Sequence, residues 1–262
     1  GLQESCRGDH REVTILDRPP PEWKRPPIPC RIRLQVLLNQ QGRSTVDNER
    51  LGRIEDTHFD HRPALSARKF DIPVVFASSS EVYGSAVGNM PISEDHLLQP
   101  QSPYAASKAA GDRMCFAWQD TYGLRVNIVR GFNTYGPGQN SGPYGGVISR
   151  FVRQTLVGEP MTVYGDGRQR RDFMWVGDSV AAYLLSLESD WDGPINFGTG
   201  RTVSVLELAD LIIGILGRGR ITFCDRRPGE VQNLPADIRK AASLGWEPKV
   251  PFEKGLRDYT NL

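Results

Sequence analysis

Two apolar runs flank a helix signal in the middle of this 262-residue chain: Ile72-Pro-Val-Val-Phe-Ala-Ser78 comes before it and Leu124-Arg-Val-Asn-Ile-Val129 comes after it. Short runs rich in β-branched residues are typical of parallel strands that are covered on both faces. Between them, Ser102 and Pro103 are a suitable N-cap and first residue for a helix over residues 103–120. This strand–helix–strand order predicts an α/β fold with a parallel sheet.

The same alternation continues to the end of the chain. We expect helices over about 147–157 and 178–187 and an amphipathic helix over 203–216 that Thr202 precedes. Strands are predicted at 161–164, 195–197 and 221–224, and residues 131–146 are predicted to form a Gly/Pro/Asn loop. Residues 12–17 have the pattern of a buried strand, whereas residues 30–69 are rich in arginine and show no clear periodicity.

Tyr104 and Lys108 are the strongest chemical signal, because residues four apart lie on one face of a helix. An ammonium beside a phenol favours the tyrosinate and lowers its pKa, so that the phenol can take a proton from an alcohol. A surface tyrosine and lysine would show the same spacing. Ser78, Ser79 and Ser80 end the preceding strand, where open α/β sheets bind ligands, although a serine-rich turn is the simpler interpretation.

Composition excludes several other classes. The formal net charge is +1, which gives no indication of a nucleic-acid partner, and no apolar run is long enough to cross a membrane. No two of the four cysteines are close in sequence, as a zinc site or a redox dithiol would require, so we expect free thiols. No secretory signal is visible, so we expect a cytoplasmic protein. His58 and His61 form the one histidine pair, which we interpret as a surface loop rather than a metal site.

Seven motifs occur in a fixed order between residues 63 and 258. They are Ser78-Ser-Ser-Glu-Val-Tyr-Gly84, Ser102-Pro-Tyr-Ala-Ala-Ser-Lys108, Arg130-Gly-Phe-Asn-Thr-Tyr-Gly-Pro-Gly138, Val163-Tyr-Gly-Asp-Gly167, Arg171-Asp-Phe173, Asn196-Phe-Gly-Thr-Gly200 and Arg227-Pro-Gly-Glu230. Together they resemble the extended short-chain dehydrogenases that act on nucleotide sugars: 4-epimerases, 4,6-dehydratases and UDP-glucuronate decarboxylases. The resemblance implies a Rossmann-like doubly wound sheet, N-terminally incomplete here, with a smaller C-terminal substrate-binding lobe.

The resemblance also implies roles for matching residues. Ser79, Tyr104 and Lys108 would be the catalytic triad, with NAD as the cofactor, held by Ser78, Tyr104 and Lys108. The residues on the side of a UDP- or dTDP-sugar substrate would be Asn133, Val147, Tyr164, Arg171 and Arg227. Asn133 would contact the diphosphate, and Tyr164 would lie beside the nucleotide base. The two arginines would clamp the diphosphate, since a guanidinium offers phosphate oxygens a planar donor fork, although each could instead form a surface ion pair.

The cofactor half departs from the family pattern. No G-x-x-G-x-x-G turn occurs in the chain, although such a turn lets backbone amides meet the pyrophosphate of NAD. Asp17, at the end of the 12–17 run, is placed to bind the adenosine ribose, so we expect the first strand and most of the turn to lie upstream of residue 1. This gap leads to the hypothesis that NAD binding by this chain is impaired.

The shared first step in the family is oxidation at C4 of the sugar, in which Tyr104 would take the hydroxyl proton. Epimerisation is the first expectation, because it needs no further acid or base. A 4,6-dehydratase would need an acid–base pair, of which Glu81 could be one member, but Ser80 stands where the usual acid would be. Decarboxylation ranks third, because the stretch 143–147 lacks an arginine for the sugar carboxylate.

A non-catalytic remnant that binds nucleotide sugars is the alternative of another class. In terms of domains, we expect residues 1–130, together with about 172–200, to form the NAD-binding part and 131–262 to be mainly the nucleotide-sugar-binding lobe. Apolar residues on the 103–120 helix, Met114, Phe116 and Trp118, are compatible with a homodimer and equally with an ordinary core.

Overall fold

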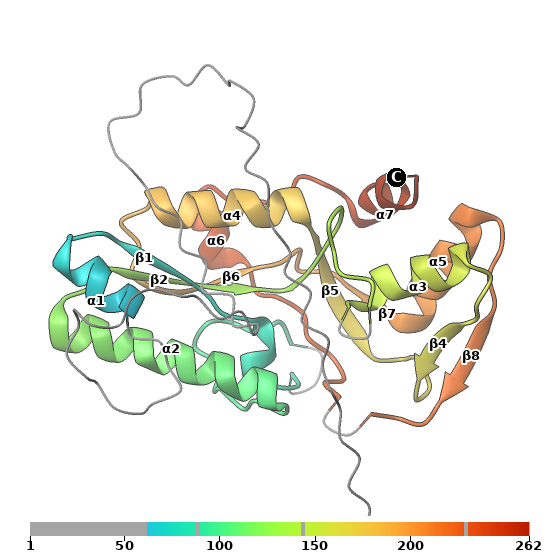
Figure 1. The fold of residues 1–262 in the computed structure, drawn as a ribbon, viewed down its shortest axis with the longest axis horizontal. Coiled ribbons are helices and arrows are strands. Elements are labelled where there is room, and N and C mark those ends of the chain that lie inside the picture. Colours follow the sequence, from blue (N-terminus) through green and yellow to red (C-terminus); the bar gives the residue numbers. More distant parts are fainter. Residues whose placement is uncertain (1–61, 87–89, 143–144, 228–229, 262) are drawn as a thin grey trace, which may run out of the picture. The chain divides into compact units, whose positions relative to one another are not determined.

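The computed structural model describes residues 62–86, 90–142, 145–227 and 230–261 (Figure 1). Its first sheet is fully parallel, in the order β1–β2–β6, and consists of β1 (Val74–Ala77), β2 (Val126–Gly131) and β6 (Gly193–Phe197). Val75 pairs with Asn127 in β2, and Val129 pairs with Ile195 in β6. The three strands predicted near residues 72, 124 and 195 are therefore confirmed, and they share one sheet.

Helices cover both faces of this sheet. Helix α2 (Pro103–Tyr122) lies on one face, and α4 (Val176–Glu188) and the short α6 (Arg239–Ser243) lie on the other (Figure 1). Ser102 caps α2 by accepting a hydrogen bond from the backbone N–H of Ala105 at 3.1 Å. Sheet strands that are buried on both sides explain the continuous apolar runs in the sequence, and they confirm the Rossmann-like α/β class.

The rest of the chain forms two further sheets. One has the order β3–β5–β7, and its strands are β3 (Asn133–Tyr135), β5 (Arg170–Trp175) and β7 (Thr202–Ser204). The other is a parallel pair of β4 (Met161–Tyr164) and β8 (Ile221–Cys224). The remaining elements are α1 (Arg62–Lys69), the 3₁₀ helix η1 (Ser80–Tyr83), α3 (Val147–Leu156), α5 (Val205–Leu216) and α7 (Phe252–Thr260).

Two predictions in this region were wrong. The stretch 131–146, expected to be a loop throughout, contains β3, because its backbone pairs in parallel with β5 through Asn133 and Phe173. Thr202 does not lead directly into the amphipathic helix, because it lies in β7, opposite Asp172. The helix is capped by Ser204, whose side chain and Glu207 form a reciprocal capping box.

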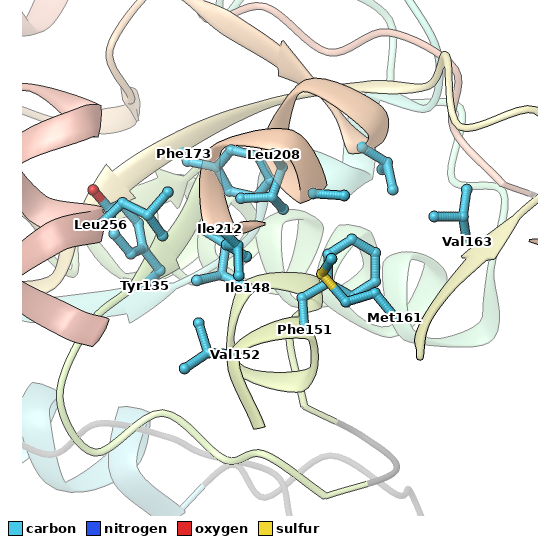
Figure 2. Close-up of a cluster of buried hydrophobic side chains, with 12 residues drawn as sticks. Tyr135, Ile148, Phe151, Val152, Met161, Val163, Phe173, Leu208, Ile212 and Leu256 are labelled. Carbon is cyan, nitrogen blue, oxygen red and sulfur yellow. The ribbon is translucent and has the colours of Figure 1, made fainter. Parts of the chain in front are cut away.

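The largest apolar cluster packs α3 and α5 against β4 and β5. Leu208 and Ile212 of α5 are fully buried, and so are Ile148 and Phe151 of α3 (Figure 2). The α5 pair is four residues apart, as expected of one helical face. This cluster fixes α3 and β4, from which Arg150 and Tyr164 of the candidate site project.

Asp172 joins three segments that are far apart in the sequence. Its carboxylate accepts hydrogen bonds from Thr199 N and Oγ1 (2.8 and 2.6 Å), Gly200 N (2.8 Å) and Ala236 N (3.3 Å). Burial raises the pKa of Asp172 to about 6, although these four donors favour its ionised form. The neighbouring residue in β5 is Arg171, so this carboxylate also holds the strand that carries a predicted substrate ligand.

Close packing of α2 on β1 generates a stability prediction. A Cβ atom at Gly111 of α2 would overlap the ring of the buried Phe76, whereas a Cβ at the exposed Gly214 of α5 would meet nothing within 4 Å. Gly111→Ala should therefore lower the free energy of unfolding by about 1–3 kcal/mol through overpacking. Gly214→Ala, the matched control, should raise it by up to about 1 kcal/mol because alanine favours helix. Urea denaturation measures both; equal stabilisation by the two variants would contradict the packing argument.

Candidate active site

A pocket opens at the carboxyl ends of β1 and β2, beside the first turn of α2. It is lined by the serines at residues 78–80 and by Glu81, Tyr104, Asn133, Thr134 and Tyr183 among others. The strand ends and the helix start bring together residues that are up to about 100 positions apart in the chain. The pocket thus lies where an open parallel sheet places its ligand.

Ser79 and Tyr104 lie together in this pocket. Ser79 has extended backbone and caps η1, and its Oγ accepts a hydrogen bond from Glu81 N at 3.2 Å. It also lies close enough to the Tyr104 hydroxyl to lower the pKa of that phenol. The Tyr104 side chain is about half exposed, so a ligand in the pocket has access to it.

The expected lowering of the Tyr104 pKa by Lys108 is not found in this arrangement. Burial is the largest influence on the Tyr104 phenol and raises its pKa, and the nearby Glu81 raises it further. Lys108 Nζ lies 5.9 Å from the centre of the Tyr104 ring and donates a hydrogen bond to the carbonyl of Ala77 at 2.9 Å. Burial also lowers the pKa of Lys108, against the opposing charge of Asp112. Lys108 is not among the groups that shift the pKa of Tyr104 here, so the lowering that the spacing argument expected is not seen.

Glu81 and Arg171 influence each other across this region. Burial raises the pKa of Glu81, and the charge of Arg171 opposes that rise. Burial likewise lowers the pKa of Arg171, opposed by the charges of Glu230 and Glu81. The guanidinium also donates a hydrogen bond to the backbone carbonyl of Arg170 at 2.9 Å. A predicted catalytic acid and a predicted phosphate ligand are thus electrostatically coupled.

The other predicted substrate residues fall into separate places. Asn133 lines the pocket, and its amide donates to the Asp172 carbonyl at 3.1 Å. Tyr164 and Arg227 pack together, with the guanidinium carbon 3.7 Å from the ring centre. Val147 is the first residue of α3 and does not line the pocket of Tyr104.

Sequence reasoning missed Thr134, Ser179 and Arg150. Thr134 and Ser179 line the pocket and their hydroxyls hydrogen-bond each other at 3.3 Å. Arg150 is the second arginine beside Tyr164, at 5.8 Å from the ring centre. Thr134 follows Asn133 in the motif Arg130–Gly138, which could have indicated it, whereas Ser179 and Arg150 lie in none of the seven motifs. Only the packing of the elements brings them to the site.

A buried polar network lies beneath the pocket. Arg130, at the end of β2, forms an ion pair with Asp112 of α2 at 2.8 Å and donates to the Tyr83 hydroxyl at 2.8 Å. The Tyr83 hydroxyl in turn donates to the Asn196 side chain at 2.7 Å, and Asn196 N donates to Glu94 Oε1 at 2.8 Å. These bonds link the helix of Tyr104 to the turn that Ser79 begins.

The residues of this pocket fit the nicotinamide-ribose end of NAD. The Lys108 ammonium has three N–H groups and uses one of them on Ala77, which leaves donors for ribose hydroxyls. The buried Ser78 hydroxyl has no hydrogen-bond partner among the described residues and lines the same pocket. A glycine-rich turn for the pyrophosphate does not occur in the sequence, and Asp17 lies outside the described residues.

Two further predictions are that the chain has no metal site at its histidine pair and no membrane-spanning segment. His58 and His61 lie outside the described residues. Within the part of the chain that the structure describes, no group of three or more His, Cys, Asp or Glu side chains is placed to hold a metal ion. In that same part, none of the helices combines the length and apolar character that a membrane span requires.

Residues 64–259 match the sequence profile of the family described as GDP-mannose 4,6 dehydratase. A putative UDP-glucose 4-epimerase of Methanocaldococcus jannaschii is 40% identical over 236 residues, which cover 87% of this chain and 76% of that protein. UDP-glucuronic acid decarboxylase 1 of Xenopus tropicalis is 36% identical over 197 residues, covering 72% of this chain. The chain spans only 46% of that decarboxylase.

Solved structures show the same relationship. The UDP-N-acetylglucosamine 4-epimerase of Methanobrevibacter ruminantium, in complex with UDP-N-acetylmuramic acid, has a TM-score of 0.71 and 35% identity, covering 75% of this chain and 64% of that one. The UDP-glucose 4-epimerase of Thermus thermophilus, in complex with NAD, has a TM-score of 0.72 and 32% identity, covering 76% and 66%.

The buried ion pair generates the prediction for this site. Asp112→Ala leaves the Arg130 guanidinium buried without its carboxylate, so it should lower the free energy of unfolding by about 3–5 kcal/mol. The double variant Asp112→Leu/Arg130→Met, which removes both charges, should be less destabilised than Asp112→Ala. Chemical denaturation of wild type and of the single and double variants gives the comparison. A double variant that is as unstable as Asp112→Ala, or less stable, would contradict the prediction that the unpaired guanidinium causes the loss.

Proposed function

This chain belongs to the NAD-dependent epimerase/dehydratase family of extended short-chain dehydrogenases, and we propose that it is a nucleotide-sugar 4-epimerase acting on a UDP-sugar through a 4-keto intermediate. The observation that carries the proposal is the pocket that Ser79, Tyr104 and Asn133 line together, with Lys108 on the same helix face as Tyr104 and Asn133 just after the end of β2. The epimerase relatives at 40% and 35% identity support the substrate class.

In this proposal the pocket positions the sugar so that its C4 hydroxyl meets Tyr104. Tyr104 takes the hydroxyl proton, and the Ser79 hydroxyl hydrogen-bonds the reacting oxygen. Lys108 and Ser78 would hold the nicotinamide ribose of NAD, which when bound supplies the hydride acceptor. With the hydride returned to the opposite face of C4, the proton that passes back from Tyr104 to the oxygen of the turned keto sugar would complete the epimerisation, and no additional acid or base is required.

One observation favours dehydration as the second candidate. Burial raises the pKa of Glu81, which lines the same pocket, so this carboxyl keeps more of its protonated form near neutral pH than an exposed one. A protonated carboxyl beside a keto sugar can donate a proton to a leaving hydroxyl. Ser80, however, offers no second acid, so epimerisation remains the proposed reaction.

Decarboxylation has less support from the described residues. It requires a cation for the carboxylate of the sugar, because a buried carboxylate without a partner is costly. In the stretch 143–147, Gly145, Gly146 and Val147 are described, and none of them carries a charge. The decarboxylase relative at 36% identity is a reason to assay decarboxylation as well, after epimerisation.

Calorimetric titration separates an enzyme from a non-catalytic nucleotide-sugar-binding protein. We expect the purified chain to bind UDP-glucose, and impaired NAD binding would appear as weak or absent heat on titration with NAD. If both bind, NMR of the product mixture should show UDP-galactose. If the chain binds a UDP-sugar but neither binds NAD nor turns the sugar over, the epimerase proposal is wrong and the non-catalytic binding protein is the better interpretation. Failure to bind any UDP-sugar would contradict both.

Tyr104→Phe tests the assignment of the base. Removal of this hydroxyl should lower kcat for epimerisation by roughly 10²–10⁴-fold, because proton transfer by a positioned side chain contributes about that much. Binding of UDP-glucose should stay nearly unchanged in calorimetry. Tyr122→Phe is a matched control at the end of the same helix, where Tyr122 contacts Trp118 and Arg68 instead. Equal activity of the two variants would exclude Tyr104 as the base.

A further inference from the structure

Two arginines meet at one tyrosine near the ends of β4 and β8. The guanidinium carbon of Arg227 lies 3.7 Å from the centre of the Tyr164 ring, and that of Arg150 lies 5.8 Å from the same centre. Arg227 first, and Arg150 after it, lower the pKa of the Tyr164 phenol. The proposed roles for Tyr164 and Arg227 came from family motifs, whereas Arg150 lies in none of them.

The position of Arg150 follows from a reciprocal tie between α3 and β4. Gln154 donates to Thr162 Oγ1 at 3.0 Å and accepts from Thr162 N at 3.2 Å. Arg150 is four residues before Gln154, on the same face of the helix, and Tyr164 is two residues after Thr162, on the same face of the strand. The chain reverses direction between α3 and β4. The step from Gln154 back to Arg150 and the step from Thr162 forward to Tyr164 therefore run in the same direction in space. The tie therefore sets Arg150 opposite Tyr164.

Among the described residues, neither arginine has an acid to neutralise it. No ion pair in that part of the chain links Arg150 or Arg227 to a carboxylate, although Arg153, one turn further along α3, pairs with Glu159 at 3.8 Å. The acid nearest in sequence to Tyr164, Asp166, pairs with Arg168 instead. Two like charges on one ring repel each other, and the face of an aromatic ring offsets this only in part. An anion between them would convert the repulsion into attraction.

We propose that Arg150 is a further substrate-binding residue, which together with Arg227 binds the diphosphate of the nucleotide sugar over Tyr164. This inference rests on the proposed function and adds a ligand that the motifs do not include. A diphosphate suits the arrangement because it offers several oxygens to two donor forks at once, whereas an uncharged base or sugar would leave both charges unneutralised. The chemical class recognised is a nucleoside diphosphate, with or without its sugar.

Titration of the full chain with UDP tests this role. Arg150→Gln should weaken UDP binding roughly tenfold or more, since charge-assisted hydrogen bonds to phosphate are lost. Arg150→Lys should fall between, because lysine keeps the charge and loses the planar fork. Arg153→Gln makes the same change of charge on the same helix and should bind UDP as wild type does. Thermal melting of each variant verifies that it is folded.

A second probe distinguishes phosphate recognition from contact with the base. Saturation-transfer NMR with uridine, which lacks phosphate, should give the same signals for wild type and Arg150→Gln. Equal weakening of UDP and uridine would place Arg150 on the base and overturn the proposal, as would unchanged UDP binding by Arg150→Gln. If Arg150→Gln binds UDP unchanged while wild type binds UDP-glucose, the role of Arg150 is overturned and the proposed function still stands. Wild type that binds neither UDP nor UDP-glucose would overturn the function itself.

Discussion

The ion pair and hydrogen bonds of the buried Arg130 guanidinium are the interactions on which the geometry of the candidate site depends. Arg130 lies at the end of β2 with 2% of its surface exposed and contacts both Asp112 of α2 and the Tyr83 hydroxyl at the end of η1. Tyr104 begins the helix that Asp112 holds, and Ser79 begins the turn that Tyr83 ends. A charge buried this deeply is tolerated only with full pairing. The requirement to satisfy one guanidinium therefore keeps the serine and the tyrosine together.

Asp172 is a second buried charge, negative where Arg130 is positive, and it holds separate segments together around β5. It sits in β5 between Arg171 and Phe173, which lines the apolar core, and it gathers the backbone of Thr199, Gly200 and Ala236. The strand that presents Arg171 is thereby tied to two loops rather than to a helix. Both buried charges serve the site through geometry, because they fix the backbone from which the functional side chains project.

The sequence predicted the elements that have strong periodicity, and it missed those fixed by partners. The strand at 161–164 and the helix from 103 were correct because apolar pattern and capping are local signals. Strand β5 carries Arg170, Arg171 and Asp172, so its pattern is not apolar, and its pairing with β3 and β7 decides its conformation. Arg150 was missed for the same reason: a tie between Gln154 and Thr162 places it, and no motif contains it.

The electrostatics of the pocket show why spacing alone misjudged its chemistry. Burial raises the pKa of Tyr104 and Glu81 and lowers that of Lys108 and Arg171, so every one of these groups is driven toward its neutral form. A charged ligand beside these groups would shift their pKa values further. A diphosphate at Arg171 would compete with Glu81 for the guanidinium and so raise the pKa of that carboxyl. Tyr104 would respond oppositely to any added positive charge, which would favour the tyrosinate. A bound ligand would therefore add its own charge to the effect of burial on the pKa values of Glu81 and Tyr104.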